Sequence, residues 1–455
     1  MSSASNRNCR EERTASALFT DLYELTMLQA YLEEGMTAEA VFSLFTRHLP
    51  QRRNFLLACG LDPVLDYLEN LRFSEEDLAF LASTERFSAR FLDWLRDFRF
   101  TGEVRAVPEG TPVFGEEPIL EIRAPLPEAQ LIETFVINQV HLQTVLASKA
   151  SRVVMAAEGR PVVDFGARRI HGLDAALKAA RAYHIAGVAA TSNVLAGREY
   201  GLPLSGTMAH SYIQAHDEEA AAFRAFARIY PGSVMLVDTY DTPEGVRKVI
   251  ELVKEPGSEF RVRAVRLDSG DLLELSREAR RLLDDAGLTD IEIFASGGLD
   301  ENGIAELVKA GAPIDGFGVG TSMGVSEDEP KLDMAYKLCE YAGTGRLKLS
   351  TGKPVLPGSK QVFRVGGPDG DERDVIARAD EALPGRPLLI PVMREGKRLA
   401  AGRTDPESAR AHAREQIARL PEGVRALGPA ERPYEVTVSP ALAAYQDEVK
   451  AALGY

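Results

Sequence analysis

The sequence predicts an α/β fold, in which an irregular, TIM-like α/β barrel is joined to an α+β domain formed by the N-terminal and C-terminal segments. Seven short apolar runs recur between residues 161 and 320 at intervals of roughly 17 to 31 residues, with helix-like stretches between them. Each run ends in polar or glycine-rich residues, and parallel barrels carry their chemistry at the carboxyl ends of the strands. The sequence therefore places its chemically useful residues around one mouth.

The chain is expected to contain four consecutive parts. Residues 1–16 are polar and form a flexible tail, and residues 17–149 form the N-terminal α+β domain. The α/β barrel with the active site follows over 150–342. Residues 343–455 form a C-terminal segment that packs with the N-terminal domain.

Local patterns predict the elements of these parts. Leucines recur at helical spacing from Leu18 to Leu32, and apolar runs broken by Pro and Gly turns predict strands. Outside the barrel we expect a helical pair at 75–98, strands at 103–107 and 119–122, a helix at about 127–158, strands at 361–365 and 387–393, and helices at 405–420 and 440–453. Barrel strands are expected near 161–166, 186–191, 204–209, 233–239, 262–268, 290–295 and 315–320, with an eighth at 334–341.

Composition narrows the class of protein. Hydrophobic residues make up 45% and charged residues 27% of the chain, as in ordinary soluble proteins. The net charge of −15 disfavours nucleic acid as a partner, whereas a local pocket of Arg168, Arg169 and Arg266 would suit a small anion. Three widely separated cysteines argue against a disulfide framework and favour a reducing cytoplasm. No run is long enough to span a bilayer, and the N-terminus lacks the apolar core of a signal peptide.

Glycine turns end the last two clear barrel strands, Ser296-Gly297-Gly298 and Gly318-Val319-Gly320-Thr321. Glycine lets backbone N–H groups approach an anion, and the N-terminus of a following helix adds a favourable dipole. Each turn alone is equally well explained as an ordinary tight turn. Their pairing in adjacent βα units favours a phosphate site.

A cation and two carboxylates meet in Arg266-Leu267-Asp268-Ser269-Gly270-Asp271. One interpretation is an ion pair plus a helix cap, with Ser269 or Asp271 capping a helix over 271–287. The other is a site for ribose hydroxyls or magnesium, because magnesium prefers hard oxygen ligands. Both interpretations can hold together.

Three more residues at strand ends are candidates. His210 follows the strand that ends in Gly206-Thr207-Met208-Ala209; a lone histidine is usually structural, but its place among the strand ends favours a function. Asp238 and Asp241 form a second acidic pair that is as ambiguous as Asp268. Phe165 offers a flat apolar face beside Arg168, and on sequence grounds alone it is best explained as a core aromatic. The histidines form no spaced pair that suggests zinc.

Taken together, these motifs resemble the nicotinate phosphoribosyltransferase family, a group of type II phosphoribosyltransferases. The resemblance covers nearly the whole chain, and its motifs follow the order of the family. They are Leu18 to Met27, Asp164 to Arg169, Gly206 to Ser211, Leu267 to Asp271, Ser296 to Leu299, Thr351 to Pro354 and Pro357 to Val362.

The resemblance implies a reaction. The family joins nicotinate to 5-phosphoribosyl 1-diphosphate, releases diphosphate and makes nicotinate mononucleotide in the salvage branch of NAD biosynthesis, coupled to ATP hydrolysis. It also implies Mg²⁺ as cofactor, ATP as co-substrate, and a cytoplasmic homodimer with shared active sites. Neither nucleic acid nor a membrane is an expected partner.

The same resemblance implies residue roles. His210, Asp268 and Arg266 form the catalytic set, and His210 is the residue that ATP phosphorylates, giving a phosphohistidine. Phe165 and Tyr23 of the partner subunit sandwich the pyridine ring. Arg168 and Arg266 are expected to bind the substrate carboxylate or diphosphate, and Asp268 to contact the ribose or ring region. The 5′-phosphate is expected to contact Gly297, Gly298, Gly320 and Thr321. Two further residues are expected to bind substrate, Ser192 and Asp238. No metal ligand is assigned.

Other functions remain as alternatives. Nicotinamide phosphoribosyltransferase carries a carboxylate near the ring amide, whereas the matching segment here, Thr191 to Val194, has no acid. Quinolinate phosphoribosyltransferase is shorter and needs more cations for two carboxylates. A non-catalytic barrel acting as a binding protein is the third alternative, against which His210, Asp268 and both glycine turns argue.

Overall fold

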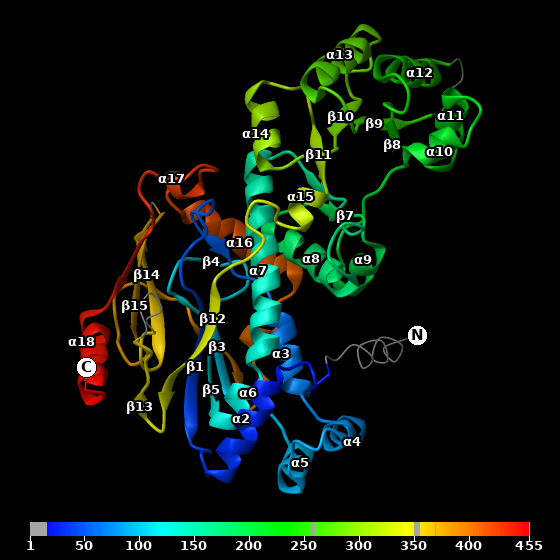
Figure 1. Cartoon of the computed structure of the whole chain (residues 1–455). Helices are drawn as coiled ribbons and strands as arrows, with labels where there is room; N and C mark the ends of the chain where they lie inside the picture. The colour runs from blue at the N-terminus through cyan, green and yellow to red at the C-terminus, as the bar shows by residue number, and fades with distance from the viewer. Residues whose placement is uncertain (1–15, 256–259, 350–354, 369, 455) are drawn as a thin grey trace. The chain divides into compact units, whose positions relative to one another are not determined.

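The structure is a computed structural model that describes residues 16–255, 260–349, 355–368 and 370–454. The chain divides into two compact units, which we call unit 1 (Met1–Val145 with Lys331–Tyr455) and unit 2 (Leu146–Pro330). Helix α7 (Glu133–Ala156) contributes to both (Figure 1). The predicted tail and the motif from Thr351 to Pro354 lie outside the described residues. Within the described ranges no helix combines the length and the apolar character that crossing a membrane requires.

Unit 1 is built on an antiparallel sheet with the strand order β13-β12-β1-β5-β3-β17-β18. A second sheet has the order β16-β14-β15-β19, and β2 pairs with β4. The strands are β1 (Glu39–Thr46), β2 (Leu56–Leu57), β3 (Glu103–Ala106), β4 (Pro112–Val113), β5 (Pro118–Pro125), β12 (Met334–Tyr341), β13 (Thr344–Gly345), β14 (Lys360–Gly367), β15 (Gly370–Arg378), β16 (Arg386–Pro387), β17 (Ile390–Arg394), β18 (Lys397–Arg398) and β19 (Glu435–Val438).

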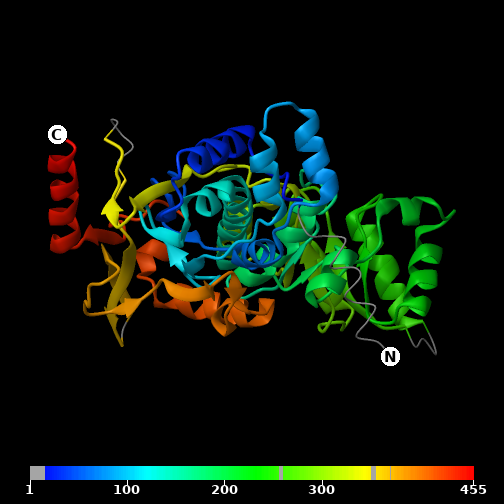
Figure 2. The ribbon, with the colours of Figure 1, turned by 90° about the horizontal axis from the view of Figure 1, so that it is seen from below.

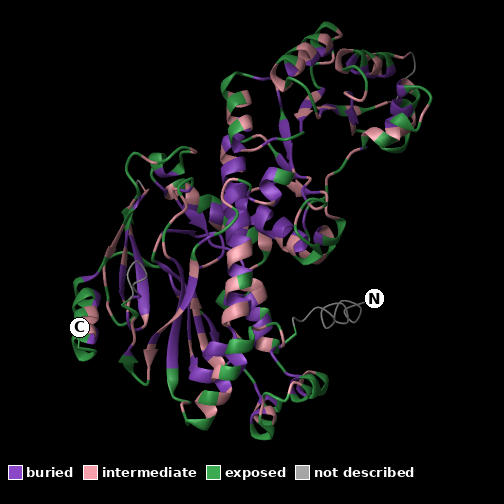
Figure 3. Ribbon diagram, in the orientation of Figure 1, coloured by how far each residue is buried: buried purple, intermediate pink, exposed green. Residues whose placement is uncertain are grey.

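The helices of unit 1 complete its hydrophobic core. Central strands such as β1 are buried along almost their whole length, while the outer faces of the helices remain exposed (Figure 3). Figure 2 shows α4 and α5 side by side as a projecting pair, as the pattern at 75–98 predicts. The helices are α2 (Leu22–Glu33), α3 (Leu61–Asn70), α4 (Glu75–Ser83), α5 (Ala89–Arg96), α6 (Leu126–Leu131), the short 3₁₀ helix η1 (Ala400–Gly402), α16 (Pro406–Arg419), α17 (Glu422–Arg425) and α18 (Pro440–Ala452).

Unit 2 contains a parallel six-stranded sheet with the order β7-β6-β11-β10-β9-β8. Its strands are β6 (Val162–Asp164), β7 (Ala190–Thr191), β8 (Ser233–Leu236), β9 (Val262–Leu267), β10 (Glu292–Ala295) and β11 (Gly316–Val319). Its helices are α8 (Leu173–Ala186), α9 (Val194–Tyr200), α10 (His210–Gln214), α11 (Glu219–Ile229), α12 (Thr242–Lys254), α13 (Leu272–Asp285), α14 (Glu301–Lys309) and α15 (Thr321–Gly324). This alternation of strands and helices confirms the predicted α/β class.

The pairings among the described residues leave the sheet open between β7 and β8, so it forms half of a barrel. The strand expected at 204–209 is reduced to an isolated bridge between Leu204 and Thr191. Pro203 has no N–H to donate and Gly206 interrupts the run, which explains why no longer strand forms there. Closure into a complete barrel stays a prediction.

The predicted eighth barrel strand is wrong. Residues Met334–Tyr341 form β12, which pairs antiparallel with β1 in unit 1. A return to the parallel sheet would need a crossover connection, usually a helix. The chain between α15 and β12 contains no helix, so the strand joins the antiparallel sheet.

The first helix of unit 1, α2, carries a buried carboxylate. Glu24 of α2 is fully buried and accepts hydrogen bonds from the hydroxyls of Thr20 (2.8 Å) and Thr134 (3.0 Å). Burial raises the pKa of Glu24 from its ordinary 4.5 to about 7, although both hydroxyls oppose the shift. The folded protein therefore keeps this proton at pH values where the unfolded chain has released it.

We expect the free energy of unfolding to fall between about pH 4.5 and 7 and to level off above pH 7. The reason is that the folded state binds the Glu24 proton more tightly, so raising the pH favours unfolding in this window by up to about 3 kcal/mol. Glu24→Gln should flatten this decline, measured by urea denaturation across the pH range. Glu33→Gln, an exposed position on the same helix that pairs with Arg90, should keep the decline; an equally steep decline in Glu24→Gln would contradict the assignment.

Candidate active site

The predicted site residues of unit 2, apart from His210, lie at or just after the carboxyl ends of parallel strands. Phe165 and Arg168 follow β6, Ser192 follows β7 and Asp238 follows β8. The others are Arg266 near the end of β9, Asp268 just after it, Gly297 and Gly298 after β10, and Gly320 and Thr321 after β11. Because strands of one parallel sheet end at the same edge, the topology brings these residues to one side of unit 2.

Phe165 is held with one cation beside its ring. The guanidinium carbon of Arg266 lies 5.9 Å from the ring centroid, a cation–π distance. The ring packs against Gly318, where a Cβ atom would come within 2.5 Å of it. The structure thus assigns Phe165 a position beside a buried cation, which its interpretation as a simple core aromatic did not include.

Arg266 is mostly buried and only partly paired. One of its terminal nitrogens donates to the Met208 carbonyl oxygen at 3.0 Å, while its Nε is buried without a hydrogen-bond partner among the described residues. Burial lowers the pKa of Arg266, and the carboxylates of Asp268 and Asp238 act in the opposite direction. A buried guanidinium with an unused N–H is well placed to receive an anion.

His210 is the first residue of α10 and faces Asp268. Its Nε2 lies 3.7 Å from Asp268 Oδ2, and its Nδ1 lies 3.1 Å from the hydroxyl of Thr239. Both the His210 and Asp268 side chains remain more than one-third exposed, so reactants can reach them. The structure therefore brings together His210 and Asp268, which the sequence analysis placed at the ends of two different predicted strands.

Asp238 organises the turn after β9. One carboxylate oxygen accepts hydrogen bonds from the Asp268 N–H (2.9 Å) and the Ser269 hydroxyl (2.7 Å). Asp271, whose carboxylate accepts from two backbone N–H groups, caps α13, so it and not Ser269 is the helix cap. The other oxygen of Asp238 is buried without a partner among the described residues.

The two glycine turns are tied to the rest of the site. Gly297 has φ +92° and approaches Asp268 so closely that a Cβ would lie 1.7 Å from its carbonyl oxygen. Ser296 donates to the Asp268 carboxylate at 2.5 Å. The hydroxyl of Ser322, beside Thr321, donates to the Leu299 carbonyl oxygen at 2.5 Å and joins the two turns. We call the pair of turns, 296–299 and 318–322, the phosphate cradle.

The buried carboxylate of Asp164 holds the loops that carry Phe165 and Ser192. It accepts from the Gly166 N–H and from the Thr191 hydroxyl, both at 2.7 Å. Asn193 caps α9 through a hydrogen bond from the Ala196 N–H. Ser192 is thus the residue of this segment whose side chain has no structural bond among those described.

Tyr23 belongs to α2 of unit 1 and is 47% exposed. Its predicted role in a partner's site stays a prediction. Residues that the sequence interpretation missed are Thr239, Ser322 and Phe294, whose ring lies 6.4 Å from that of Phe165. Thr239 had a signal, since it directly follows Asp238 at a strand end.

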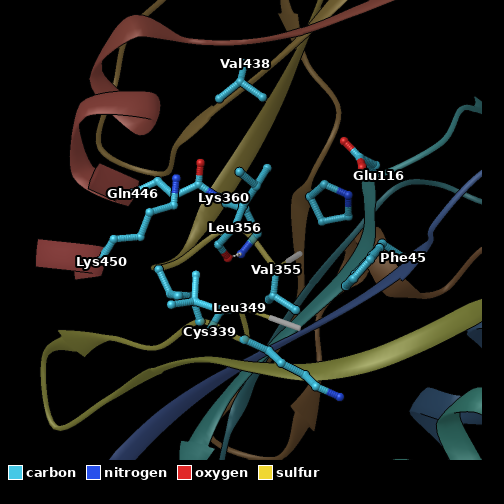
Figure 4. Close-up of a pocket in the computed structure, with 13 residues that line it drawn as sticks. Phe45, Glu116, Cys339, Leu349, Val355, Leu356, Lys360, Val438, Gln446 and Lys450 are labelled. Carbon is cyan, nitrogen blue, oxygen red and sulfur yellow. Dashed lines mark hydrogen bonds between the residues drawn. The ribbon is translucent and has the colours of Figure 1, made fainter. Parts of the chain in front are cut away.

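Unit 1 contains a separate cavity of about 460 Å³, which Figure 4 shows. Its walls are largely apolar, and Lys360 from the Pro357 to Val362 motif lies at its side. The ammonium group of Lys360 is already bound by Glu121 (3.2 Å) and the Gly358 carbonyl oxygen (2.7 Å). No predicted site residue lines this cavity, so we place the candidate site at the strand ends of unit 2.

Comparison with known proteins matches two family models to most of the chain. The family model for the nicotinate phosphoribosyltransferase N-terminal domain matches residues 18–141, and the nicotinate phosphoribosyltransferase family model matches residues 161–370. The second match includes every predicted site residue of unit 2.

Relatives and one solved structure match most of the chain along most of their own length. The chain is 57% identical over 423 residues to nicotinate phosphoribosyltransferase pncB2 of Mycobacterium tuberculosis, covering 93% of this chain and 91% of the relative. It is 41% identical over 377 residues to nicotinate phosphoribosyltransferase of Bacillus subtilis, covering 81% and 77%. The crystal structure of human nicotinic acid phosphoribosyltransferase superposes with a TM-score of 0.85 at 28% identity, covering 94% of this chain and 99% of the human one.

We expect Gly297→Ala to destabilise the protein far more than Gly298→Ala. At Gly297 the new Cβ would overlap the Asp268 carbonyl oxygen and φ is left-handed, so the cost should exceed about 2 kcal/mol. At Gly298 the space is open and only the left-handed φ of +66° is strained, at about 1 kcal/mol. Urea denaturation followed by circular dichroism measures both. Equal losses would show that the close approach at Gly297 is not rigid.

Proposed function

Because this chain belongs to the nicotinate phosphoribosyltransferase family, we propose that it makes nicotinate mononucleotide from nicotinate and 5-phosphoribosyl 1-diphosphate in NAD salvage. The bond between C1 of the ribose and the diphosphate oxygen breaks, and a bond from C1 to the pyridine nitrogen forms. The observation that carries the proposal is the gathering of an aromatic face, a mostly buried arginine, carboxylates and two glycine turns at one edge of the parallel sheet.

The aromatic and cationic groups suit nicotinate. Phe165 offers a face for the pyridine ring, and Arg266 beside it offers a buried positive charge for the carboxylate. Arg168 lies in the same loop as Phe165 and adds positive charge near Arg266. Ser192 follows the neighbouring strand and contributes a neutral group.

The phosphate cradle suits the 5′-phosphate of the second substrate. Gly298 leaves open space beside its backbone, and Gly320 and Thr321 belong to the turn that Ser322 ties to it. Glycine permits the close approach of backbone N–H groups to phosphate oxygens. The nine-residue helix α14 begins just after the first turn and directs its positive end toward it.

Magnesium suits the same edge as a cofactor, although the described residues contain no cluster of three acidic, histidine or cysteine ligands. The partnerless Oδ1 of Asp238 is a hard oxygen, and Mg²⁺ usually keeps few protein ligands when phosphates and water supply the others. When bound, the ion would neutralise charge on the departing diphosphate. Asp238 and Asp268 are the residues that would hold it, and their carboxylates also favour positive charge developing at C1.

His210 is proposed to accept a phosphoryl group from ATP. Thr239 occupies Nδ1, which leaves Nε2 as the nucleophile; a bond from Nε2 to the γ-phosphorus forms while the bond to the ADP oxygen breaks. The added negative charge would lie near Asp268 and the magnesium-bound diphosphate. We also propose a homodimer in which Tyr23 of the partner subunit covers the pyridine ring, and the 47% exposed side chain of Tyr23 supports this role. The buried cysteines Cys59 and Cys339, which are not joined in a disulfide, support a reducing, cytoplasmic location.

The wild-type protein should use nicotinate at least about 100-fold more efficiently than nicotinamide. A carboxylate at about 4 Å from a cation gains up to roughly 4 kcal/mol at an effective dielectric near 20, of which desolvation takes part. Ser192→Asp should narrow the preference by weakening nicotinate, measured as kcat/KM for mononucleotide formation from each substrate. Ser192→Asn is the neutral control. Equal use of both substrates by the wild type would favour the nicotinamide enzyme, and no mononucleotide from either would favour a binding protein.

His210→Ala should abolish an acid-labile, base-stable label from γ-labelled ATP and uncouple ATP hydrolysis from synthesis. Slow ATP-independent synthesis should survive, because His210 does not attack the ribose. His216→Ala serves as the control, since His216 lies on the following turn and bonds only to the Tyr212 carbonyl oxygen among its described hydrogen bonds. A label that persists in His210→Ala would assign the phosphoryl group to another residue.

A further inference from the structure

A cluster of buried charges lies behind the phosphate cradle. Lys149 of α7 is 1% exposed, and its ammonium group lies 2.5 Å from Glu301 Oε2 and 2.8 Å from Asp328 Oδ1. Arg152, one helical turn along α7, donates from Nε to Glu301 Oε1 at 2.9 Å. All four residues belong to unit 2. The proposed chemistry uses none of them, so their burial needs another explanation.

The two acids of this cluster belong to the two halves of the cradle. Glu301 is the first residue of α14, three positions after Gly298, and it is fully buried. Asp328 lies in the turn that follows α15, which itself begins at Thr321. Lys149 therefore contacts two segments, one that continues from each glycine turn.

Among the described residues, one side-chain hydrogen bond joins the two turns of the cradle directly. The Ser322 hydroxyl joins the turns on one side, and Asp300 caps α14 through the N–H groups of Asn302 and Gly303. Glycine gives the turns access to an anion but loses much conformational entropy when ordered. Lys149 supplies a second link between the turns, set back from the anion, and a buried ion pair fixes geometry more narrowly than apolar contact does.

We propose that Lys149, supported by Arg152, is a positioning residue that locks the two glycine turns into one phosphate-binding geometry. It does not touch the ligand; it holds the start of α14 and the turn after α15 at a fixed separation. The ligand class is a phosphate monoester, and its identity as 5-phosphoribosyl 1-diphosphate rests on the proposed function. The role concerns mainly this substrate, because Arg168 and Ser192 lie on other loops and Phe165 touches only the second turn, at Gly318.

The test replaces Lys149 by Met, which keeps length and apolar stem but removes the charge. Lys149→Met should weaken binding of 5-phosphoribosyl 1-diphosphate at least about tenfold and raise its KM similarly, while kcat and the KM for nicotinate change less than about threefold. Lys149→Arg should restore binding to within about threefold of wild type, since it can reach both acids. Isothermal titration calorimetry and steady-state kinetics measure these quantities.

Lys248→Met is the matched control for lost stability. Lys248 also pairs with a buried glutamate of unit 2, Glu219 (3.1 Å), but it joins α12 to α11 and touches neither glycine turn. It should lower the melting temperature without changing affinity for 5-phosphoribosyl 1-diphosphate. If Lys149→Met behaves like this control, or loses both substrates equally, Lys149 is structural and the proposal is wrong.

Two further measurements keep the outcome decisive. If Lys149→Met does not fold, Asp328→Asn removes only the charge on the α15 side, and it should still raise the KM for 5-phosphoribosyl 1-diphosphate more than about threefold; an unchanged KM overturns the proposal. Titration with inorganic phosphate separates the proposed function from the positioning role of Lys149. A wild type that binds inorganic phosphate but not the diphosphate substrate overturns the proposed function, and Lys149→Met must then weaken phosphate binding for the positioning role to stand.

Discussion

The hydrogen bonds that Asp238 accepts from the turn after β9 are the constraint on which the candidate site depends. They fix the backbone of Asp268, whose carbonyl oxygen packs directly against Gly297. The Asp268 side chain in turn accepts from Ser296 and faces His210. A shift of this one turn would therefore move the Asp268 carboxylate, its contact with His210 and the first glycine turn together. Parallel strands make this coupling possible, because the ends of β8, β9 and β10 are neighbours in the sheet.

The site also carries unmet hydrogen-bonding capacity. Asp238 Oδ1 and Arg266 Nε are buried without partners among the described residues, and buried polar groups of this kind cost free energy. A protein gains from keeping them only if a bound group satisfies them. The Asp238 oxygen suits a hard cation, and the Arg266 N–H suits an anion. A magnesium-bound diphosphate would bring the cation, and a substrate carboxylate would bring the anion. The acceptor and the donor are both in place before the ligand arrives, as electrostatic preorganisation requires.

Sequence reasoning found the strands and the residues at their ends, because both depend on local patterns. Apolar runs that end in Asp, Arg or paired glycines mark the carboxyl ends of β6, β8, β9, β10 and β11 directly. It could not find what depends on contacts between distant segments. The placement of β12 beside β1, the reach of Lys149 to Asp328 and the bond from Thr239 to His210 join residues far apart in the chain or on different elements. It also misjudged the run at 204–209, where Pro203 and Gly206 limit pairing more than the apolar character favours it.

Glycine-rich anion sites face a general difficulty, because the residue that gives the ligand access to the backbone is also the residue that orders it least well. In this chain the order is supplied from neighbouring positions. Gly297 packs closely against the carbonyl oxygen of Asp268, whereas a Cβ atom at Gly298 would meet no atom within 4 Å. The segment after Gly298 is instead held by the Asp300 cap and by Glu301, whose carboxylate forms salt bridges with both Lys149 and Arg152. Replacing such a buried pair by apolar side chains often costs little stability, so its retention is better explained by the geometry that it imposes than by the stability that it adds. The rigid support of the cradle is thus the buried cluster of Lys149, Arg152, Glu301 and Asp328, and the glycine turns rest on that cluster.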